Sequence, residues 1–153
     1  MNGYTNQYFA NTVNSATPEQ LMLMLYDGAI RFLNLAVQAI DNKQIDKRAY
    51  NINKASAIIS EFAATLDHSQ DAGLAENLDA LYSYMLTRLL DGNLKNDTEP
   101  LEEVKTMLAD LRTTWAQAID LNKQDSKAMN NGYAAAGTDA SPTAPPKSFA
   151  VAM

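Results

Sequence analysis

The chain has 153 residues, which is enough for one domain with a single hydrophobic core. Because it contains no cysteine, a disulfide scaffold, a thiol nucleophile and a cysteine-ligated zinc or iron–sulfur site are all excluded. Its 12 basic and 18 acidic residues give a net charge of -6, and the basic residues are not clustered as nucleic-acid binding requires, so no nucleic-acid partner is expected.

Residues 1–16 show no sustained helical or strand period but carry the large side chains of Tyr4, Tyr8 and Phe9. Such aromatic residues usually pack against something, so we predict an arm that lies on the body of the protein. Two interpretations stay open: a permanently packed cap, or a cover over a groove that another chain can take over. The segment lacks the basic region and apolar core of a secretory signal, which favours an intracellular protein.

Residues 17–42 carry the strongest helix signal. Thr17 is a suitable N-cap, and Gln20 completes a capping box with it. The apolar run at residues 21–25 points to several sides of a helix, so this helix needs covering on more than one side. Gly28 interrupts the pattern; it marks either a close approach by another backbone or a tolerated glycine.

Three further amphipathic segments follow, at about residues 45–66, 73–92 and 98–121, and turn residues separate them. The segment at 73–92 places Tyr82 and Tyr84 off its main apolar face, so it has more apolar surface than contact with one neighbouring helix can bury. Four amphipathic helices joined by short turns predict an all-α fold, an antiparallel four-helix bundle.

Residues 122–153 are rich in Ala, Asn, Gly, Ser, Thr and Pro, a composition typical of a disordered C-terminal tail. Residues 149–153, Phe-Ala-Val-Ala-Met, are apolar enough to leave a docking peptide as the alternative there. The predicted organisation is therefore an N-terminal arm at residues 1–16, a bundle at 17–121 and a tail at 122–153.

The sequence offers no candidates for catalysis. The one histidine, His68, lies in a predicted turn, which excludes a di-metal site of Glu-x-x-His pairs and argues against a phosphotransfer role. Nucleotide-binding loops and nucleophile elbows do not occur, and neighbouring acids such as Glu102 and Glu103 point apart on a helix. We therefore expect no enzyme, no metal and no cofactor.

The unusual feature is surplus apolar surface, together with seven methionines and seven tyrosines. Methionine suits surfaces that accept helical partners, and tyrosine suits amphipathic grooves. Single residues such as Met22 and Met85 are adequately explained as core, but the set as a whole indicates a groove.

Several motifs occur in order across residues 4–121. They are Ala16-Thr17-Pro18-Glu19-Gln20-Leu21, Leu25-Tyr26-Asp27-Gly28-Ala29-Ile30, Lys54-Ala55 with Ile58-Ile59, Leu81-Tyr82-Ser83-Tyr84-Met85, Asn93-Leu94-Lys95-Asn96-Asp97, and Trp115. Together they resemble the flagellin export chaperone family, FliS. The resemblance implies a bacterial cytoplasmic bundle that binds the C-terminal segment of flagellin, prevents its premature polymerisation and delivers it to the flagellar type III export apparatus.

The implied partners are the flagellin C-terminal segment and a component of the flagellar export gate, without membrane insertion. An alternative is a bundle that sequesters a flagellar regulatory protein. A third possibility is an obligate homodimer whose surplus apolar surface meets no client.

The resemblance places Tyr4 and Tyr8 in an N-terminal tyrosine region associated with covering the client groove and with docking to partners. We expect the groove on the second, third and fourth predicted bundle helices, with the first helix behind it. Surplus apolarity selects the remaining client-binding residues, which are Ile58, Ile59, Leu81, Tyr84, Met85, Leu89 and Leu94.

The turn after residues 73–92 is the last motif with an expected role. Asn93 and Asp97 are expected to fix it through bonds from side chain to backbone. Gly92 departs from the family pattern, which more often has a non-glycine residue there, so the preceding helix is expected to fray early.

Overall fold

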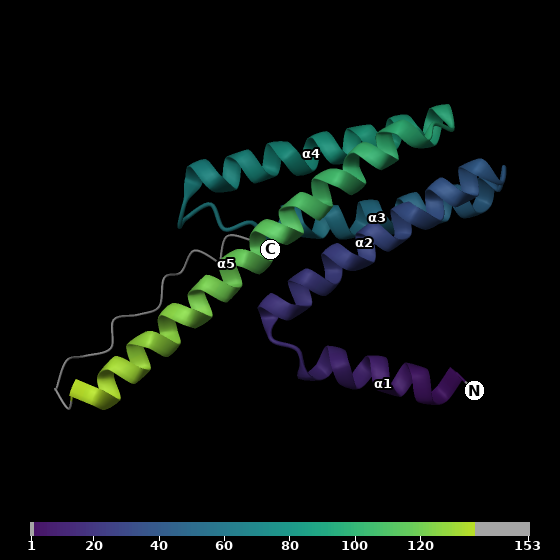
Figure 1. The fold of residues 1–153 in the computed structure, drawn as a ribbon. Coiled ribbons are helices and arrows are strands. Elements are labelled where there is room, and N and C mark those ends of the chain that lie inside the picture. Colours follow the sequence, from purple (N-terminus) through teal and green to yellow (C-terminus); the bar gives the residue numbers. More distant parts are fainter. Residues whose placement is uncertain (1, 137–153) are drawn as a thin grey trace.

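The computed structural model describes residues 2–136, and its regular elements in that range are all helices (Figure 1). They are α1 (Asn2–Ser15), α2 (Pro18–Asp41), α3 (Ile45–Ala64), α4 (Ala72–Lys95) and α5 (Thr98–Ala136). The helices α2 and α4 each pack against both α3 and α5, which closes an antiparallel four-helix bundle. The predicted fold class is confirmed.

The start of α2 has the predicted capping box. The backbone N–H of Gln20 donates to Thr17 Oγ1 at 3.2 Å, and the backbone N–H of Thr17 donates to Gln20 Oε1 at 3.0 Å. Each residue thus satisfies a donor that the helix end leaves free. The box fixes where α2 begins.

Three hydrogen-bonded aromatic residues stand at the centre of the core. Tyr26 on α2 shares a 2.7 Å bond between hydroxyls with Tyr82 on α4, and Trp115 Nε1 on α5 donates to the Tyr26 hydroxyl at 3.1 Å. Burial raises the pKa of both tyrosines above 10.0, so both hydroxyls stay protonated at neutral pH. The ring of Phe62 on α3 stacks on Tyr26, with centroids 4.4 Å apart. All four bundle helices therefore meet at this cluster.

The turn from α4 to α5 differs from the prediction. Helix α4 does not fray at Gly92 but continues to Lys95, and Asn96 ends it in the left-handed conformation with φ 53°. Asp97 accepts a bond from the backbone N–H of Glu99, as expected for a turn residue, whereas Asn93 accepts from the side chain of Arg48 at 2.9 Å. Asn93 therefore ties the turn to α3 instead of bonding its own backbone.

Gly92 lies at a close crossing, where the end of α4 packs tightly against the start of α5. A Cβ atom placed on Gly92 would lie 2.4 Å from Leu101 Cδ1 and 3.0 Å from the carbonyl oxygen of Asp97. Gly28 has ordinary space, since its Cβ would meet Ile58 Cδ1 at 3.8 Å. Gly28 is therefore a tolerated glycine, and the close approach that was one of its two interpretations is found at Gly92.

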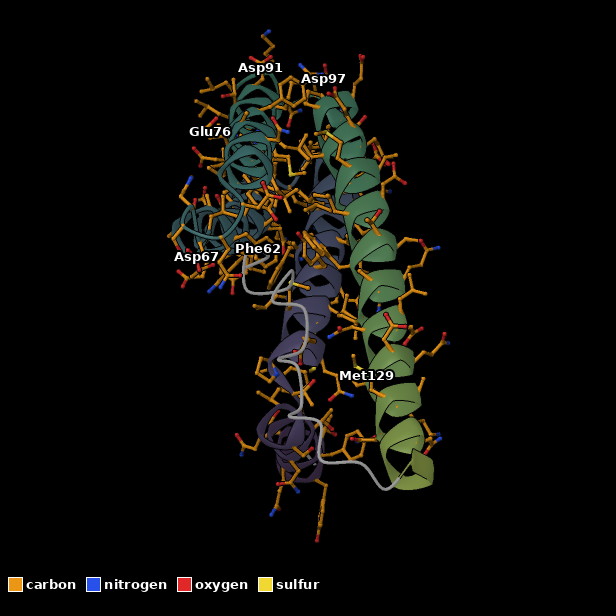
Figure 2. All side chains as sticks on the ribbon, turned by 90° about the vertical axis from the view of Figure 1, so that its left-hand side faces the viewer. Phe62, Asp67, Glu76, Asp91, Asp97 and Met129 are labelled. Atoms are coloured by element: carbon orange, nitrogen blue, oxygen red, sulfur yellow. The ribbon has the colours of Figure 1, made fainter. Side chains whose placement is uncertain are left out.

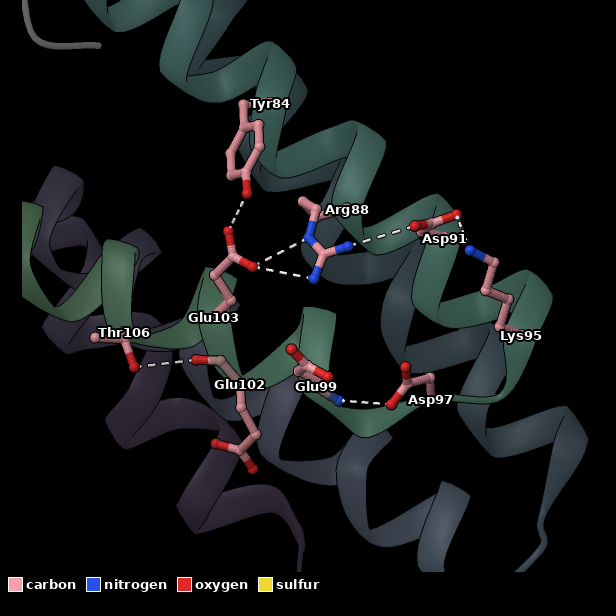
Figure 3. A network of polar contacts seen from close by, with 9 residues as sticks. All are labelled: Tyr84, Arg88, Asp91, Lys95, Asp97, Glu99, Glu102, Glu103 and Thr106. Atoms are coloured by element: carbon pink, nitrogen blue, oxygen red, sulfur yellow. Dashed lines mark hydrogen bonds and ion pairs between the residues drawn. The ribbon is translucent and has the colours of Figure 1, made fainter.

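Polar contacts join the exposed sides of α4 and α5 near this turn (Figure 3). The Tyr84 hydroxyl donates to Glu103, and Arg88 pairs with the same carboxylate at 3.0 Å. The bond from Tyr84 and the pairing with Arg88 lower the pKa of Glu103. Asp91 extends the network, because it pairs with Arg88 and with Lys95, each at 3.4 Å. These contacts fix α4 against α5 on the solvent side.

Helix α5 is longer than predicted. It runs to Ala136, so the predicted start of the tail at residue 122 falls inside a helix, while residues 137–153 lie outside the described residues. The added stretch has Lys123, Gln124, Lys127 and Ala128, which favour helix, and it has no proline. Figure 2 shows Asp97 near one end of α5 and Met129 far along it, past the packed part of the bundle.

Candidate functional site

Helix α2 has apolar surface that the bundle does not cover. It is the one described helix that is long and apolar enough to cross a membrane, a test that core helices of soluble proteins also pass. Only 33% of its most apolar window is buried, although its inner residues, such as Tyr26 and Leu33, are fully buried. The helix therefore presents a second apolar side away from the core, as the run at residues 21–25 predicted.

That side of α2 forms one wall of a cavity of about 510 Å³ between α1, α2 and α3, which we call the apolar groove. Its volume lies within the roughly 300–1,000 Å³ of ligand-binding clefts. Apolar side chains from all three helices line it: Phe9, Val13, Met24, Leu25, Phe32 and Ile58. Gly28 also lines it and adds no side chain, so the groove stays open at the middle of α2.

Charged residues form the edge of the apolar groove. Arg31 lies over the ring of Phe32, with its guanidinium carbon 4.8 Å from the ring centroid. Asp27 accepts two bonds from Arg112 on α5, at 2.6 and 3.1 Å. Asp27 and Met24 also line a second cavity of about 360 Å³, so the two cavities adjoin at these residues.

The first helix borders the groove but leaves most of its aromatic surface in solvent. Tyr4 is 88% exposed and Tyr8 is 75% exposed. Phe9 and Val13 line the apolar groove, although Phe9 is itself 64% exposed. The prediction that the aromatic residues of this arm pack on the body is therefore wrong for the two tyrosines. Figure 1 shows the reason, since α1 folds back at an angle from α2 and stands outside the bundle.

Comparison with known proteins identifies the family of this chain. The family described as "Flagellar protein FliS" matches residues 1–122. The chain belongs to the FliS family. It is 43% identical to the flagellar secretion chaperone FliS of Bacillus subtilis over 124 residues, which cover 81% of this chain and 91% of that protein. It is 36% identical to the Salmonella typhimurium FliS over 115 residues, which cover 74% and 85%.

Membership in the FliS family settles the class of function. The chain is a flagellar secretion chaperone, and FliS chaperones are cytoplasmic and not enzymes. Among residues 2–136, His, Cys, Asp and Glu side chains form no group of three that could hold a metal ion.

The client-binding residues that were predicted from the sequence do not lie together in the structure. Ile59, Met85 and Leu89 are completely buried in the bundle core, so they present no surface to a client in this conformation. Ile58 is half-buried, and it is the one member of the predicted set that lines the apolar groove.

The other predicted positions on α4 lie elsewhere. Leu81 is half-buried against the core, Tyr84 is bound to Glu103, and Leu94 is 76% exposed near the α4–α5 turn. None of the three lines the apolar groove. Met24, Leu25 and Phe32 line the apolar groove but are not among the client-binding residues predicted from the sequence. For Met24 and Leu25 the signal is the apolar run at residues 21–25, which one partner face cannot bury, but the groove was expected on the other bundle helices with this helix behind it.

Proposed function

We propose that this FliS chain binds the C-terminal segment of flagellin in the apolar groove between α1, α2 and α3. The observation that carries the proposal is an open apolar cavity on a helix whose outer apolar side the bundle leaves uncovered. The client is a segment that must stay out of the filament until it has been exported. Covering its apolar face serves that purpose without enforcing a compact client fold.

The groove suits an amphipathic helix or an extended segment with regularly spaced apolar side chains. Burial of about four large apolar side chains contributes about 1.5–3 kcal/mol each, which offsets the cost of ordering the client. The groove also exposes Met24, whose flexible side chain adapts to different client surfaces. The charged edge at Asp27 and Arg31 leaves the polar side of the client in contact with charge and water.

The binding test compares the groove with the second predicted region on α4. We expect Ile58→Ser to weaken binding of a flagellin C-terminal peptide about tenfold, because the substitution removes one apolar contact worth about 1.4 kcal/mol or more. Leu94→Ser is the matched control, because it makes the same kind of change at an exposed site outside the groove. Titration calorimetry on both variants measures the difference.

The outcomes separate the candidate sites. Loss of binding in Leu94→Ser alone would place the client on α4 and reject the groove. If the intact chain binds a flagellar regulatory protein but no flagellin peptide, the sequestering function replaces the proposed one.

We further propose that α1 acts as a partial cover over the groove. Phe9 lines the groove with part of its ring and is 64% exposed, whereas Tyr4 on the same helix does not line the groove and is 88% exposed. Phe9→Ser should therefore strengthen peptide binding about threefold to tenfold, because the client no longer displaces an apolar side chain. Tyr4→Ser is the matched control and should leave the affinity unchanged. Weaker binding in Phe9→Ser would instead make Phe9 a client contact.

Delivery to a component of the export gate is the remaining part of the proposal. The resemblance associates the N-terminal tyrosines with partner docking, and the high exposure of Tyr4 and Tyr8 supports that role.

A further inference from the structure

We propose that residues 149–153 of this same chain bind in the apolar groove and compete there with the client. The inference rests on the proposed function, because it concerns regulation of the same groove. Its basis is an open apolar cavity within reach of an apolar segment of its own chain.

The segment has a regular apolar pattern. Phe149, Val151 and Met153 alternate with Ala150 and Ala152. In an extended chain, alternate side chains lie on one side, so the three large ones share a single apolar edge. Such an edge suits a cavity lined by side chains of similar character.

The residues before this segment suit a spacer. Pro142, Pro145 and Pro146 lie between α5 and Phe149. Proline cannot continue a helix and favours an extended backbone. The sequence therefore places a stretch that favours an extended backbone between the helical part of the chain and the apolar segment.

The distance along the chain permits the contact. Arg112 is bonded to Asp27 at the edge of the groove, and Ala136 lies 24 residues further along α5. A helix of that length spans about 36 Å. The 12 residues from 137 to 148 can span up to about 40 Å when extended. Phe149 can therefore return from the end of α5 to the groove.

The spacer and the apolar segment are additions to the shared fold. The FliS match ends at residue 122, so residues 137–153 lie beyond the part that this chain has in common with the family. The groove lies within the shared part. A competitor carried on an added segment would adjust client affinity without any change in the groove itself.

The expected strength is modest. A proline-rich link of 12 residues spans about 37 Å in its extended form, which matches the distance it must cover, so its effective concentration at the groove is about 1 mM. With an intrinsic dissociation constant of about 0.1 mM, the segment would occupy the groove about ten times as often as it leaves it empty. Client binding to the intact chain would then be about tenfold weaker than binding to a chain whose segment cannot compete.

The test uses the full chain and two double variants. Phe149→Ala with Val151→Ala removes the large side chains, and Ala150→Ser with Ala152→Ser changes the alternate side as a matched control. Calorimetry measures binding of a flagellin C-terminal peptide to each. Nuclear magnetic resonance records the amide signals of Gly28 and Ile58 in the free proteins at two dilutions.

We expect the first variant to bind the peptide about tenfold more tightly and to shift the Gly28 and Ile58 signals, while the control matches the intact chain. Unchanged groove signals in the first variant would overturn the proposal, as would shifts confined to the exposed Leu121 and Met129 on α5. Signals that change with dilution would overturn the intramolecular contact and favour exchange between two copies. If no form binds the peptide, the proposed function fails, but the groove signals still decide whether the segment binds.

Discussion

Tyr26→Phe is expected to lower the free energy of unfolding by about 2–4 kcal/mol. The substitution keeps the ring but removes the hydroxyl that bonds both Tyr82 and Trp115. Two buried polar groups then lose their partner, and each such loss costs about 1–3 kcal/mol. The effect is large because the Tyr26 hydroxyl is hydrogen-bonded to residues of both α4 and α5.

Tyr82→Phe provides the control within the same cluster. It removes one hydroxyl but leaves the Tyr26 hydroxyl bonded to Trp115, so the expected cost is only about 1 kcal/mol. Urea unfolding followed by circular dichroism measures both variants without relying on Trp115 as the reporter. Equal costs for the two variants would show that Tyr26 is not the centre of the network.

Gly92→Ala is expected to destabilise the protein by about 2–3 kcal/mol, although alanine is the better helix former. The new Cβ atom would lie 2.4 Å from Leu101 Cδ1 and 3.0 Å from a backbone carbonyl oxygen. Leu101 is completely buried, so it cannot turn away into solvent, and the crossing of α4 and α5 must widen. Thermal unfolding of the variant measures the loss.

Gly28→Ala is the matched control and should have the opposite sign. Its Cβ atom would make an ordinary contact with Ile58 Cδ1 at 3.8 Å, and the helix gains up to about 1 kcal/mol from the better helix former. A stabilising Gly92→Ala, or a strongly destabilising Gly28→Ala, would contradict the assignment of the close helix crossing to Gly92.

Local patterns predicted most of the fold. The capping box of Thr17 and Gln20, the bundle and the turn role of Asp97 all follow from neighbouring residues, and the structure confirms them. The extension of α5 was missed because residues 122–136 have a composition shared by tails and by exposed helices. Without a buried face, such a stretch carries no apolar period to identify it.

The candidate site was harder to predict, for a reason visible in two neighbouring residues. Ile58 and Ile59 both read as surplus apolar surface, yet Ile58 lines the groove and Ile59 is fully buried. Adjacent residues on a helix differ by about 100° in direction, so the rotation of α3 about its axis decides which of them packs in the core. Periodicity identifies an apolar face but does not fix that rotation.

By itself, the sequence determined the class of protein: an all-helical bundle without cysteine, with surplus apolar surface on its first bundle helix and with motifs of the FliS family. Those properties depend on composition and on contacts close along the chain. The tertiary structure alone decided that Tyr82 joins Tyr26 and Trp115 in the core, that Gly92 marks the close helix crossing, and that the groove opens beside α2. These depend on how helices rotate and cross when they pack, which is set jointly by residues far apart in the chain.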